Sequence, residues 1–259
     1  MDLGIAGRKA LVCASSQGLG KACAMALASE GCAVWINGRD EGRLKAAADD
    51  IATATGAKVT PVVGDINTPE GRDRLIAACP DADILINNNE GPPPGKLEDW
   101  DHDAWIGAFE QNMLPAILLI RALMPGMRQR RFGRIINITS QMVKAPGGQM
   151  GLSTAARAGL TAVCKAISRE SVVDNVTINN VLPYLIDSGR QKFLRERAAR
   201  LQNITVEEAR ARQENNVAAK RMGTPEEFGA ACAFLCSAQA GYICGQNLQL
   251  DGGTYAGLV

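Results

Sequence analysis

The stretch that most restricts the fold of this chain lies near its beginning, where a short apolar segment runs into a glycine-containing turn and then a helical pattern. Residues 9–14, KALVCA, read as a buried strand, and 21–31, KACAMALASEG, read as a helix. In the turn between them, SSQGLG, Gly18 and Gly20 suit a backbone that must approach a pyrophosphate at a helix N-terminus. The pattern therefore predicts a dinucleotide-binding unit. The other turn residues expected to contact the dinucleotide are Ser15, Gln17 and Leu19.

The remainder of the chain repeats this alternation of buried strands and helices. A chain of 259 residues with 46% apolar and 21% charged content is long enough for one large α/β domain. We therefore expect residues 1–259 to form a single domain with a doubly wound (Rossmann) parallel sheet of about seven strands and helices on both faces. A long helix is expected over 99–127. The further strands are expected at 33–37, 58–65, 84–87, 133–140 and 176–183, with a last one within 241–253.

The composition limits which kinds of partner the protein is expected to bind and in which compartment we expect it. The formal charge of +1 and the pI near 7.5 do not favour nucleic acid or an acidic membrane surface. The start, MDLGIAGRKALV, lacks the features of a signal peptide, and we expect no window to be apolar enough for long enough to span a bilayer, so we expect a cytoplasmic protein. The eight cysteines form no Cys-x-x-Cys pair, and His102 is the single histidine, so no metal site is expected.

The end of the second strand bears on cofactor choice. In this fold a carboxylate at that point bonds the ribose hydroxyls of NAD, whereas a cation accepts the 2′-phosphate of NADP. Here Gly38 and Arg39 stand at that point, so NADP(H) is favoured over NAD(H). The alternative is that Arg39 is an ordinary exposed side chain and that Asp40 caps the next helix.

These motifs together resemble those of the short-chain dehydrogenase/reductase family, in particular its 3-oxoacyl-ACP-reductase-like members, and the resemblance spans the whole chain. CASSQGLG is similar to the family's Thr-Gly-x-x-x-Gly-x-Gly, with Cys13 and Ala14 in place of Thr and Gly; we expect negative φ at Ala14. Asn87-Asn88-Asn89-Glu90 stands where the family has Asn-Asn-Ala-Gly. The resemblance implies cofactor contacts at Asp65, Ile66, Asn88, Asn89, Arg157, Pro183 and Ile186.

The catalytic motif departs from the family most. Where the family has Tyr-x-x-x-Lys, this chain has Ser153-x-x-x-Arg157, four residues apart and so on one helix face. Serine is a much weaker acid than a phenol, and arginine cannot give up its proton in a relay. Ser140 and Asn112 match the residues that orient the carbonyl and hold a relay water. The family's mechanism is therefore not expected intact.

The resemblance implies an NAD(P)(H)-dependent oxidoreductase acting on a carbonyl or secondary alcohol, with a rebuilt proton donor. Tyr184 replaces a glycine beside the nicotinamide and is the candidate donor, with Arg157 tuning its phenol; packing is the alternative role. Two other functions remain open: a dinucleotide-binding pseudoenzyme or regulatory subunit, and a lyase or isomerase using Glu90 or Lys144 as acid or base. The family pattern also implies a homotetramer or homodimer and a helical substrate lid near 188–221.

Overall fold

The computed structural model describes residues 2–258. Within them a parallel sheet of seven strands has the order β3-β2-β1-β4-β5-β6-β7, which confirms the predicted doubly wound fold. The strands are β1 (Lys9–Val12), β2 (Ala33–Gly38), β3 (Val59–Val63), β4 (Ile84–Asn87), β5 (Gly133–Ile138), β6 (Val176–Pro183) and β7 (Asn247–Leu250).

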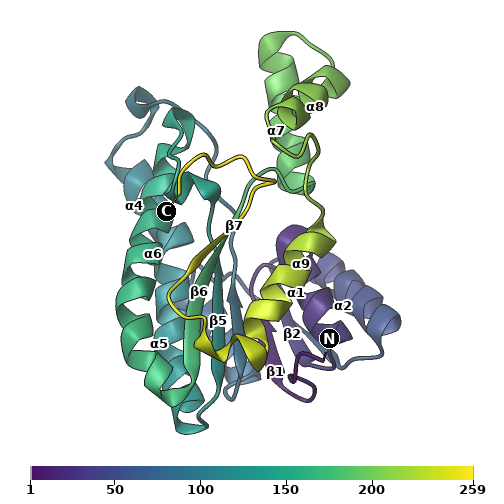
Figure 1. Cartoon of the computed structure of the whole chain (residues 1–259), viewed down its shortest axis with the longest axis vertical. Helices are drawn as coiled ribbons and strands as arrows, with labels where there is room; N and C mark the ends of the chain where they lie inside the picture. Colours follow the sequence, from purple (N-terminus) through teal and green to yellow (C-terminus); the bar gives the residue numbers. More distant parts are fainter. Residues whose placement is uncertain (1, 259) are drawn as a thin grey trace.

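Helices cover both faces of this sheet (Figure 1). One face carries α1 (Gly18–Ser29), α2 (Glu41–Thr55) and α9 (Pro225–Cys236), and a core cluster of aliphatic and cysteine side chains lies beneath them. The other face carries α3 (Pro69–Ala78), α4 (His102–Asn112), α5 (Leu114–Gln129) and α6 (Gly151–Ser171) over a second cluster. Because both faces are buried, the central strands β4 and β5 read as apolar runs.

The prediction of one long helix over 99–127 is wrong in one respect, because the segment forms two helices. α4 ends at Asn112 and α5 begins at Leu114, with Met113 between them at φ −129° and ψ −58°. Pro115 lies in the first turn of α5, where its missing N–H costs no hydrogen bond but prevents continuation of the preceding helix. The break places the Asn112 side chain at a helix end, where it faces the sheet.

The same segment corrects the expectation about membranes. By length and composition alone His102–Gln129 is apolar enough to cross a bilayer. In the fold, however, the segment is interrupted at Met113, and Leu119, Ile120 and Leu123 of α5 are buried against the sheet. The apolar residues of α5 thus belong to a helix that covers one face of a parallel sheet.

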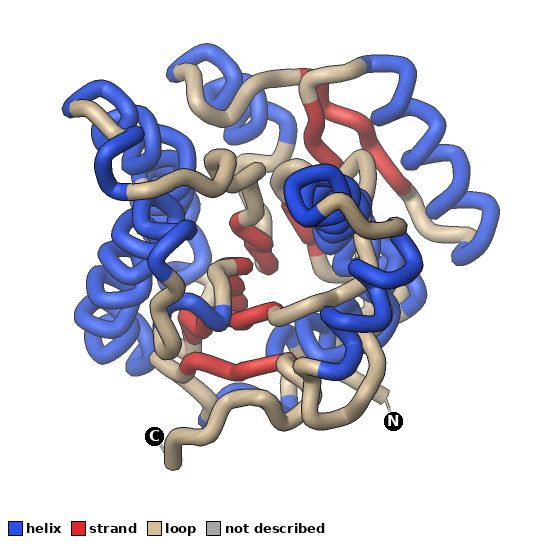
Figure 2. Tube along the Cα trace, turned by 90° about the horizontal axis from the view of Figure 1, so that it is seen from above, coloured by secondary structure: helices blue, strands red, loops and turns tan. Residues whose placement is uncertain are grey.

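A helical hairpin stands above the carboxyl ends of the strands (Figure 1). It consists of α7 (Gly189–Gln202) and α8 (Val206–Asn215), within the stretch 188–221 predicted as a lid. Viewed from above, α7 and α8 lie beside the loops that follow the strands (Figure 2). Single 3-10 turns occur at Leu97–Asp99, Gln141–Val143, Gly148–Met150, Val172–Asp174 and Gln239–Tyr242.

Candidate active site

The turn between β1 and α1 is built for close approach of a ligand to the backbone. Gln17 precedes α1 without a side-chain hydrogen bond, so no cap side chain satisfies the first amides of the helix. Gly18 has φ +58° and open space where a Cβ would be. A Cβ on Gly20 would collide with the carbonyl oxygen of Ala14 and come within 2.9 Å of the Asn88 Nδ2 atom. The loop is therefore closely packed at Gly20, whereas the space beside Gly18 is open.

The expectation of a negative φ at Ala14 is wrong. Its φ is +44°, in the left-handed region that glycine adopts without strain. Hydrogen bonds hold it there: its N–H donates to Asn37 Oδ1 at 3.3 Å, and its carbonyl accepts from Asn88 Nδ2 at 3.1 Å. The loop thus keeps the shape that a glycine would favour, at the cost of strain in an alanine.

Two neighbouring residues support this loop from within. Ser15 is fully buried; its hydroxyl donates to the Val12 carbonyl at 2.7 Å and accepts from the Asn37 N–H at 2.9 Å. Cys13 is fully buried as well, and burial raises the pKa of its thiol to about 12. The Ser15 side chain therefore shapes the turn, and any ligand contact it makes is through its backbone.

The cation predicted to choose the cofactor is engaged in an ion pair. Arg39 follows β2 and is exposed, and its Nη2 atom lies 3.1 Å from Glu90 Oε2 at the end of β4. Asp40 caps α2 by accepting from the Arg43 N–H. Asp65 follows β3 half-buried, and the buried Ile66 lines a small cavity. Arg39 and Glu90 thus face one another across the carboxyl end of β1.

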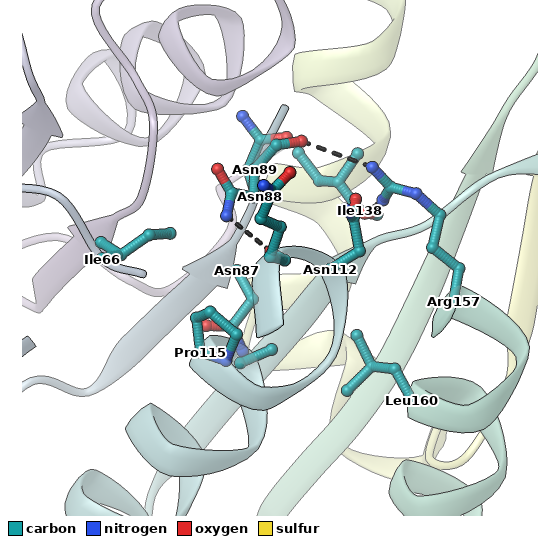
Figure 3. A pocket seen from close by; sticks show the side chains of 11 residues that line it. Ile66, Asn87, Asn88, Asn89, Asn112, Pro115, Ile138, Arg157 and Leu160 are labelled. Atoms are coloured by element: carbon teal, nitrogen blue, oxygen red, sulfur yellow. Dashed lines mark hydrogen bonds between the residues drawn. The ribbon is translucent and has the colours of Figure 1, made fainter. Parts of the chain in front are cut away.

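A small cavity of about 20 Å³ lies where β4, β5, α4, α5 and α6 meet (Figure 3). Asn112 is 5% exposed, and neither its amide nitrogen nor its amide oxygen has a hydrogen-bond partner within the described chain. A polar cavity of this size is large enough for one water molecule. The residues lining it are Ile66, Asn87, Asn88, Asn89, Gln111, Asn112, Pro115, Ala116, Ile138, Arg157 and Leu160.

A ladder of asparagine amides runs across the sheet into this cavity. Asn87 Nδ2 donates to Asn137 Oδ1 at 2.9 Å, Asn137 Nδ2 donates to Asn180 Oδ1 at 2.9 Å, and Asn180 Nδ2 donates to Asn247 Oδ1 at 2.8 Å. These four residues are paired in register across β4, β5, β6 and β7. At the cavity end, Asn87 Oδ1 has no partner among the described residues. The ladder therefore offers an open acceptor to whatever occupies the cavity.

Ser153 and Arg157 lie together on the buried face of α6, as their spacing predicts. Arg157 Nε donates to Ser153 Oγ at 3.1 Å, and Nη1 donates to the Ile138 carbonyl at 2.7 Å. Nη2 donates to the Asn89 carbonyl at 3.4 Å (Figure 3). Ser153 is 6% and Arg157 8% exposed. Burial, and secondly the charge of Arg190, lowers the pKa of Arg157 to about 10. The guanidinium is thus a buried charge bound only to neutral acceptors.

Tyr184 lies apart from the Asn112 and Arg157 cavity. It lines a second, larger cavity of about 300 Å³ and packs against Leu185, Val217 and Met222. In the described part of the chain, the hydrogen bonds of Arg157 go to Ser153, Ile138 and Asn89, with none to Tyr184. The structure therefore does not bring together the pair in which Arg157 was expected to tune the phenol.

The remaining predicted residues stand at the carboxyl ends of β5 and β6. Ser140 follows β5, and its hydroxyl accepts from the Met142 N–H at 3.2 Å. Pro183 ends β6, and Ile186 is buried and bridges to Gly223. Lys144 lies over the ring of Tyr255, its Nζ atom 5.6 Å from the ring centroid. All are thus at the sheet edge where ligands bind in open α/β folds.

The arrangement fits a dinucleotide. The unsatisfied amides of α1 and the close packing at Gly20 form a cradle for a pyrophosphate, and Arg39 and Asp65 end the neighbouring strands on the adenosine side. A metal is not indicated, since the described residues contain no group of three or more His, Cys, Asp or Glu able to hold one.

Comparison with known proteins agrees with this geometry. The family profile described as enoyl-(acyl carrier protein) reductase matches residues 13–255. The chain belongs to the short-chain dehydrogenase/reductase family. Relatives within the family include the NADPH-dependent reductase BacG of Bacillus subtilis, 32% identical over 252 residues, covering 95% of this chain and 97% of the relative. The 3-oxoacyl-[acyl-carrier-protein] reductase FabG of Vibrio harveyi is 31% identical over 254 residues, covering 98% and 99%.

A solved short-chain dehydrogenase/reductase superposes closely on this chain. L-Sorbose reductase of Gluconobacter frateurii, solved with NADPH and L-sorbose, has a TM-score of 0.95 and 29% identity, and 100% of each chain is covered. The resemblance to 3-oxoacyl-ACP reductases is thus confirmed at the level of family. Together these relatives support a general NAD(P)-dependent oxidoreductase.

Sequence reasoning missed three features of the site. The asparagine ladder has a visible signal, because Asn87, Asn137 and Asn180 each fall within a predicted strand at matching heights. Gly91 and Arg190, which adjoin Arg157, have none. Arg190 is one of many cations in a charged helix, and only the fold brings it to α6.

Proposed function

We propose that this chain is an NADP(H)-preferring oxidoreductase that moves a hydride between the nicotinamide and a carbonyl or secondary alcohol of a small molecule. The observation that carries the proposal is the β1–α1 turn, which retains its open amides and its close packing at Gly20 although Cys13 and Ala14 depart from the family pattern. A strained Ala14 held by two hydrogen bonds is difficult to explain unless the loop shape is used.

The preference for NADP(H) rests on Arg39. Its guanidinium ends β2, where the 2′-phosphate of NADP would lie, and the relative BacG and the solved sorbose reductase are named as NADPH proteins. Glu90 competes for the same guanidinium at 3.1 Å. Because this ion pair is exposed, it contributes little, and a dianionic phosphate would displace the carboxylate.

Besides the proton donor, the catalytic residues that we propose are Ser140, Asn112, Ser153 and Arg157. When bound, NADP(H) would supply or accept the hydride. Ser140 would donate a hydrogen bond to the carbonyl oxygen, and Asn112 would hold a water in the small cavity through its unpartnered amide. Arg157 would place a positive charge beside the ribose hydroxyls. Ser153 would orient Arg157 through its hydrogen bond to Nε.

We propose Tyr184 as the proton donor, with a packing role as the alternative that its contacts favour. Replacing a general acid costs about two to four orders of magnitude in turnover, so Tyr184→Phe is expected to slow the reaction by about that factor with little change in stability. A Phe variant as fast as the parent would assign Tyr184 to packing. A water held by Asn112 in the small cavity would then be the proton source to pursue.

Assembly, location and lid are further parts of the proposal. Ile106 of α4 and Leu114 of α5 are exposed apolar side chains, and a homodimer or homotetramer built on these helices would cover them. A cytoplasmic location is proposed from the sequence. The α7–α8 hairpin is proposed as the substrate lid, because it stands over the carboxyl ends of the strands (Figure 1).

The first experiment is a calorimetric titration of the pure protein with NADPH and with NADH. We expect NADPH to bind more tightly, and Arg39→Gln to weaken NADPH about tenfold or more while leaving NADH unchanged. The matched control is Arg43→Gln. Arg43 is an exposed arginine in the first turn of α2, and its substitution should change the affinity for neither nucleotide.

The outcomes separate the candidate functions. Tight NADPH binding without oxidation of NADPH by any carbonyl compound tested would favour a dinucleotide-binding pseudoenzyme or regulatory subunit. No binding of either nucleotide would overturn the oxidoreductase and leave a lyase or isomerase. Glu90→Gln offers a check on the ion pair, because freeing Arg39 is expected to strengthen NADPH binding by about fivefold at most.

A further inference from the structure

Arg157 is a buried cation without a counter-ion. Its guanidinium is 8% exposed and donates to one hydroxyl and two carbonyl oxygens, on Ser153, Ile138 and Asn89. No ion pair of the residues that the structure describes includes it. Burying a charge is unfavourable unless an opposite charge or strong hydrogen bonds compensate it. The fold therefore keeps a positive charge that it does not neutralise, which is the condition for binding an anion.

A second arginine approaches the same point from the lid. Arg190 lies in the first turn of α7, is half-buried, and donates from Nη2 to the Pro92 carbonyl at 2.8 Å. It too makes no ion pair within the described chain. The neighbouring carboxylate, Glu90, is bound to Arg39 at 3.1 Å. The two guanidinium groups thus lie near each other, and Glu90, whose charge acts on Arg190, forms its ion pair with Arg39.

Both arginines converge on the bare backbone of Gly91. A Cβ placed there would lie 3.6 Å from Arg157 Nη2, 3.6 Å from Ser153 Oγ and 4.0 Å from Arg190 Nη2. Any side chain at this position would therefore occupy the space that the three polar groups share. Glycine leaves the space to a ligand.

Ser153 completes the set of donors. Its oxygen accepts from Arg157 Nε, so its proton is oriented away from that bond and can be donated. The family's Tyr-x-x-x-Lys motif has a tyrosine at this position. A serine in its place leaves room for part of the substrate to reach the buried guanidinium. The change from Tyr and Lys to Ser and Arg thus replaces a proton donor by a site for an anion.

We infer that the substrate carries a carboxylate, bound by Arg157, Ser153 and Arg190 close to the carbonyl or alcohol that reacts. This inference rests on the proposed oxidoreductase function and specifies its substrate class. The guanidinium fork matches the planar geometry of a carboxylate. The pyrophosphate of the dinucleotide, the other anion expected in the crevice, is provided for separately by the amides of α1.

The test is calorimetry on the protein saturated with NADP⁺, titrated with hydroxy acids and with their amides. The pairs are lactate and lactamide, 3-hydroxybutyrate and 3-hydroxybutyramide, and 4-hydroxybutyrate and 4-hydroxybutyramide. At least one acid is expected to bind about tenfold or more tightly than its amide, since hydrogen bonds to a charged group account for a ratio of this size. Arg190→Gln and Arg157→Lys should each reduce that ratio severalfold. Arg200→Gln, an exposed residue on the same helix, should leave it unchanged.

Three results would overturn the inference. The first is equal binding of acid and amide in every pair, or binding of no acid. The second is a preference for the acid that neither Arg190→Gln nor Arg157→Lys diminishes, which would place the anion elsewhere. The third is a loss of NADP⁺ affinity in these variants with the acid preference intact, which would assign the arginines to the cofactor phosphates. If the parent binds no nucleotide but still prefers the acids, the proposed function fails while the carboxylate site stands.

Discussion

The nucleotide half and the catalytic half of the crevice depart from the family in different ways. In the proposed nucleotide half, Cys13 and Ala14 depart from the family's glycine-rich motif, yet the turn keeps its shape, because backbone hydrogen bonds and close packing at Gly20 set it. In the proposed catalytic half, Ser153 and Arg157 stand where the family's motif has Tyr and Lys, and they bond each other. A shape set by the backbone survives a change of side chain at the cost of strain, whereas chemistry proposed for side chains must change with them.

The strongest way to test this contrast is to restore the catalytic half. The double substitution Ser153→Tyr with Arg157→Lys is expected to raise turnover of neutral ketones with NADPH by about two to four orders of magnitude, because it returns a phenol acid and an amine to an intact nucleotide site. Steady-state kinetics on a ketone panel would measure it. The matched control is Ser153→Phe with Arg157→Lys, which lacks only the hydroxyl. Equal rates for the two double variants would mean that the phenol hydroxyl does not restore turnover. The catalytic side chains could then not be changed independently of the nucleotide site.

The next test breaks the nucleotide half. Gly20→Ala places a methyl group against the Ala14 carbonyl, so the loop must shift, and we expect NADPH binding to weaken about 10- to 100-fold. Gly107→Ala in α4 is the control, because a Cβ there meets nothing within 4 Å and its NADPH affinity should equal the parent's. Unchanged affinity in Gly20→Ala would show that the loop does not carry the nucleotide.

A smaller effect measures the strain in the same loop. Ala14→Gly relieves the left-handed conformation at φ +44°, and the net stabilisation should be about 1 kcal/mol, or a rise of about 2–4 °C in Tm. Thermal unfolding followed by circular dichroism would report it. The comparison variant is Ala46→Gly, in the exposed interior of α2, which should lose about 1 kcal/mol. A lower Tm for Ala14→Gly would mean that the alanine is not strained.

The smallest effect concerns the junction of the lid and α9. Arg221 ends the lid segment and pairs with Glu227 in the first turn of α9; this ion pair, and secondly the Thr224 N–H, lowers the pKa of Glu227 to about 2. A carboxyl whose folded pKa is depressed stabilises the fold above its unfolded value of 4.5, and this contribution is lost as the pH falls from 4.5 to 2. Glu227→Gln should therefore flatten the Tm profile over that range.

The control for this experiment is Glu226→Gln, one residue earlier in the same helix turn, which should keep the pH dependence of the parent. If Glu227→Gln shows the full pH dependence of the parent, the segment that ends at Arg221 is held by its buried contacts, such as Met222 and Val217, and not by this surface pair.

The sequence by itself determined the architecture and the position of the glycine-containing turn between β1 and α1. Parallel strands buried on both faces form apolar runs that need no partner to be recognised, and the turn at 15–20 is local in the chain. Ser153 and Arg157 could be placed on one face of α6 because their spacing alone decides that. The break at Met113 was missed, since Pro115 is compatible with the start of a helix as well as with a bend.

Only the tertiary structure decided which charges meet. Glu90 opposes Arg39 because β2 and β4 flank β1 in the sheet, and Arg190 reaches Gly91 because the chain returns over the site after β6. The left-handed conformation of Ala14 follows from hydrogen bonds to Asn37 and Asn88, both distant in sequence. Contacts such as these, between residues far apart in the chain, depend on strand order, which apolar periodicity does not encode.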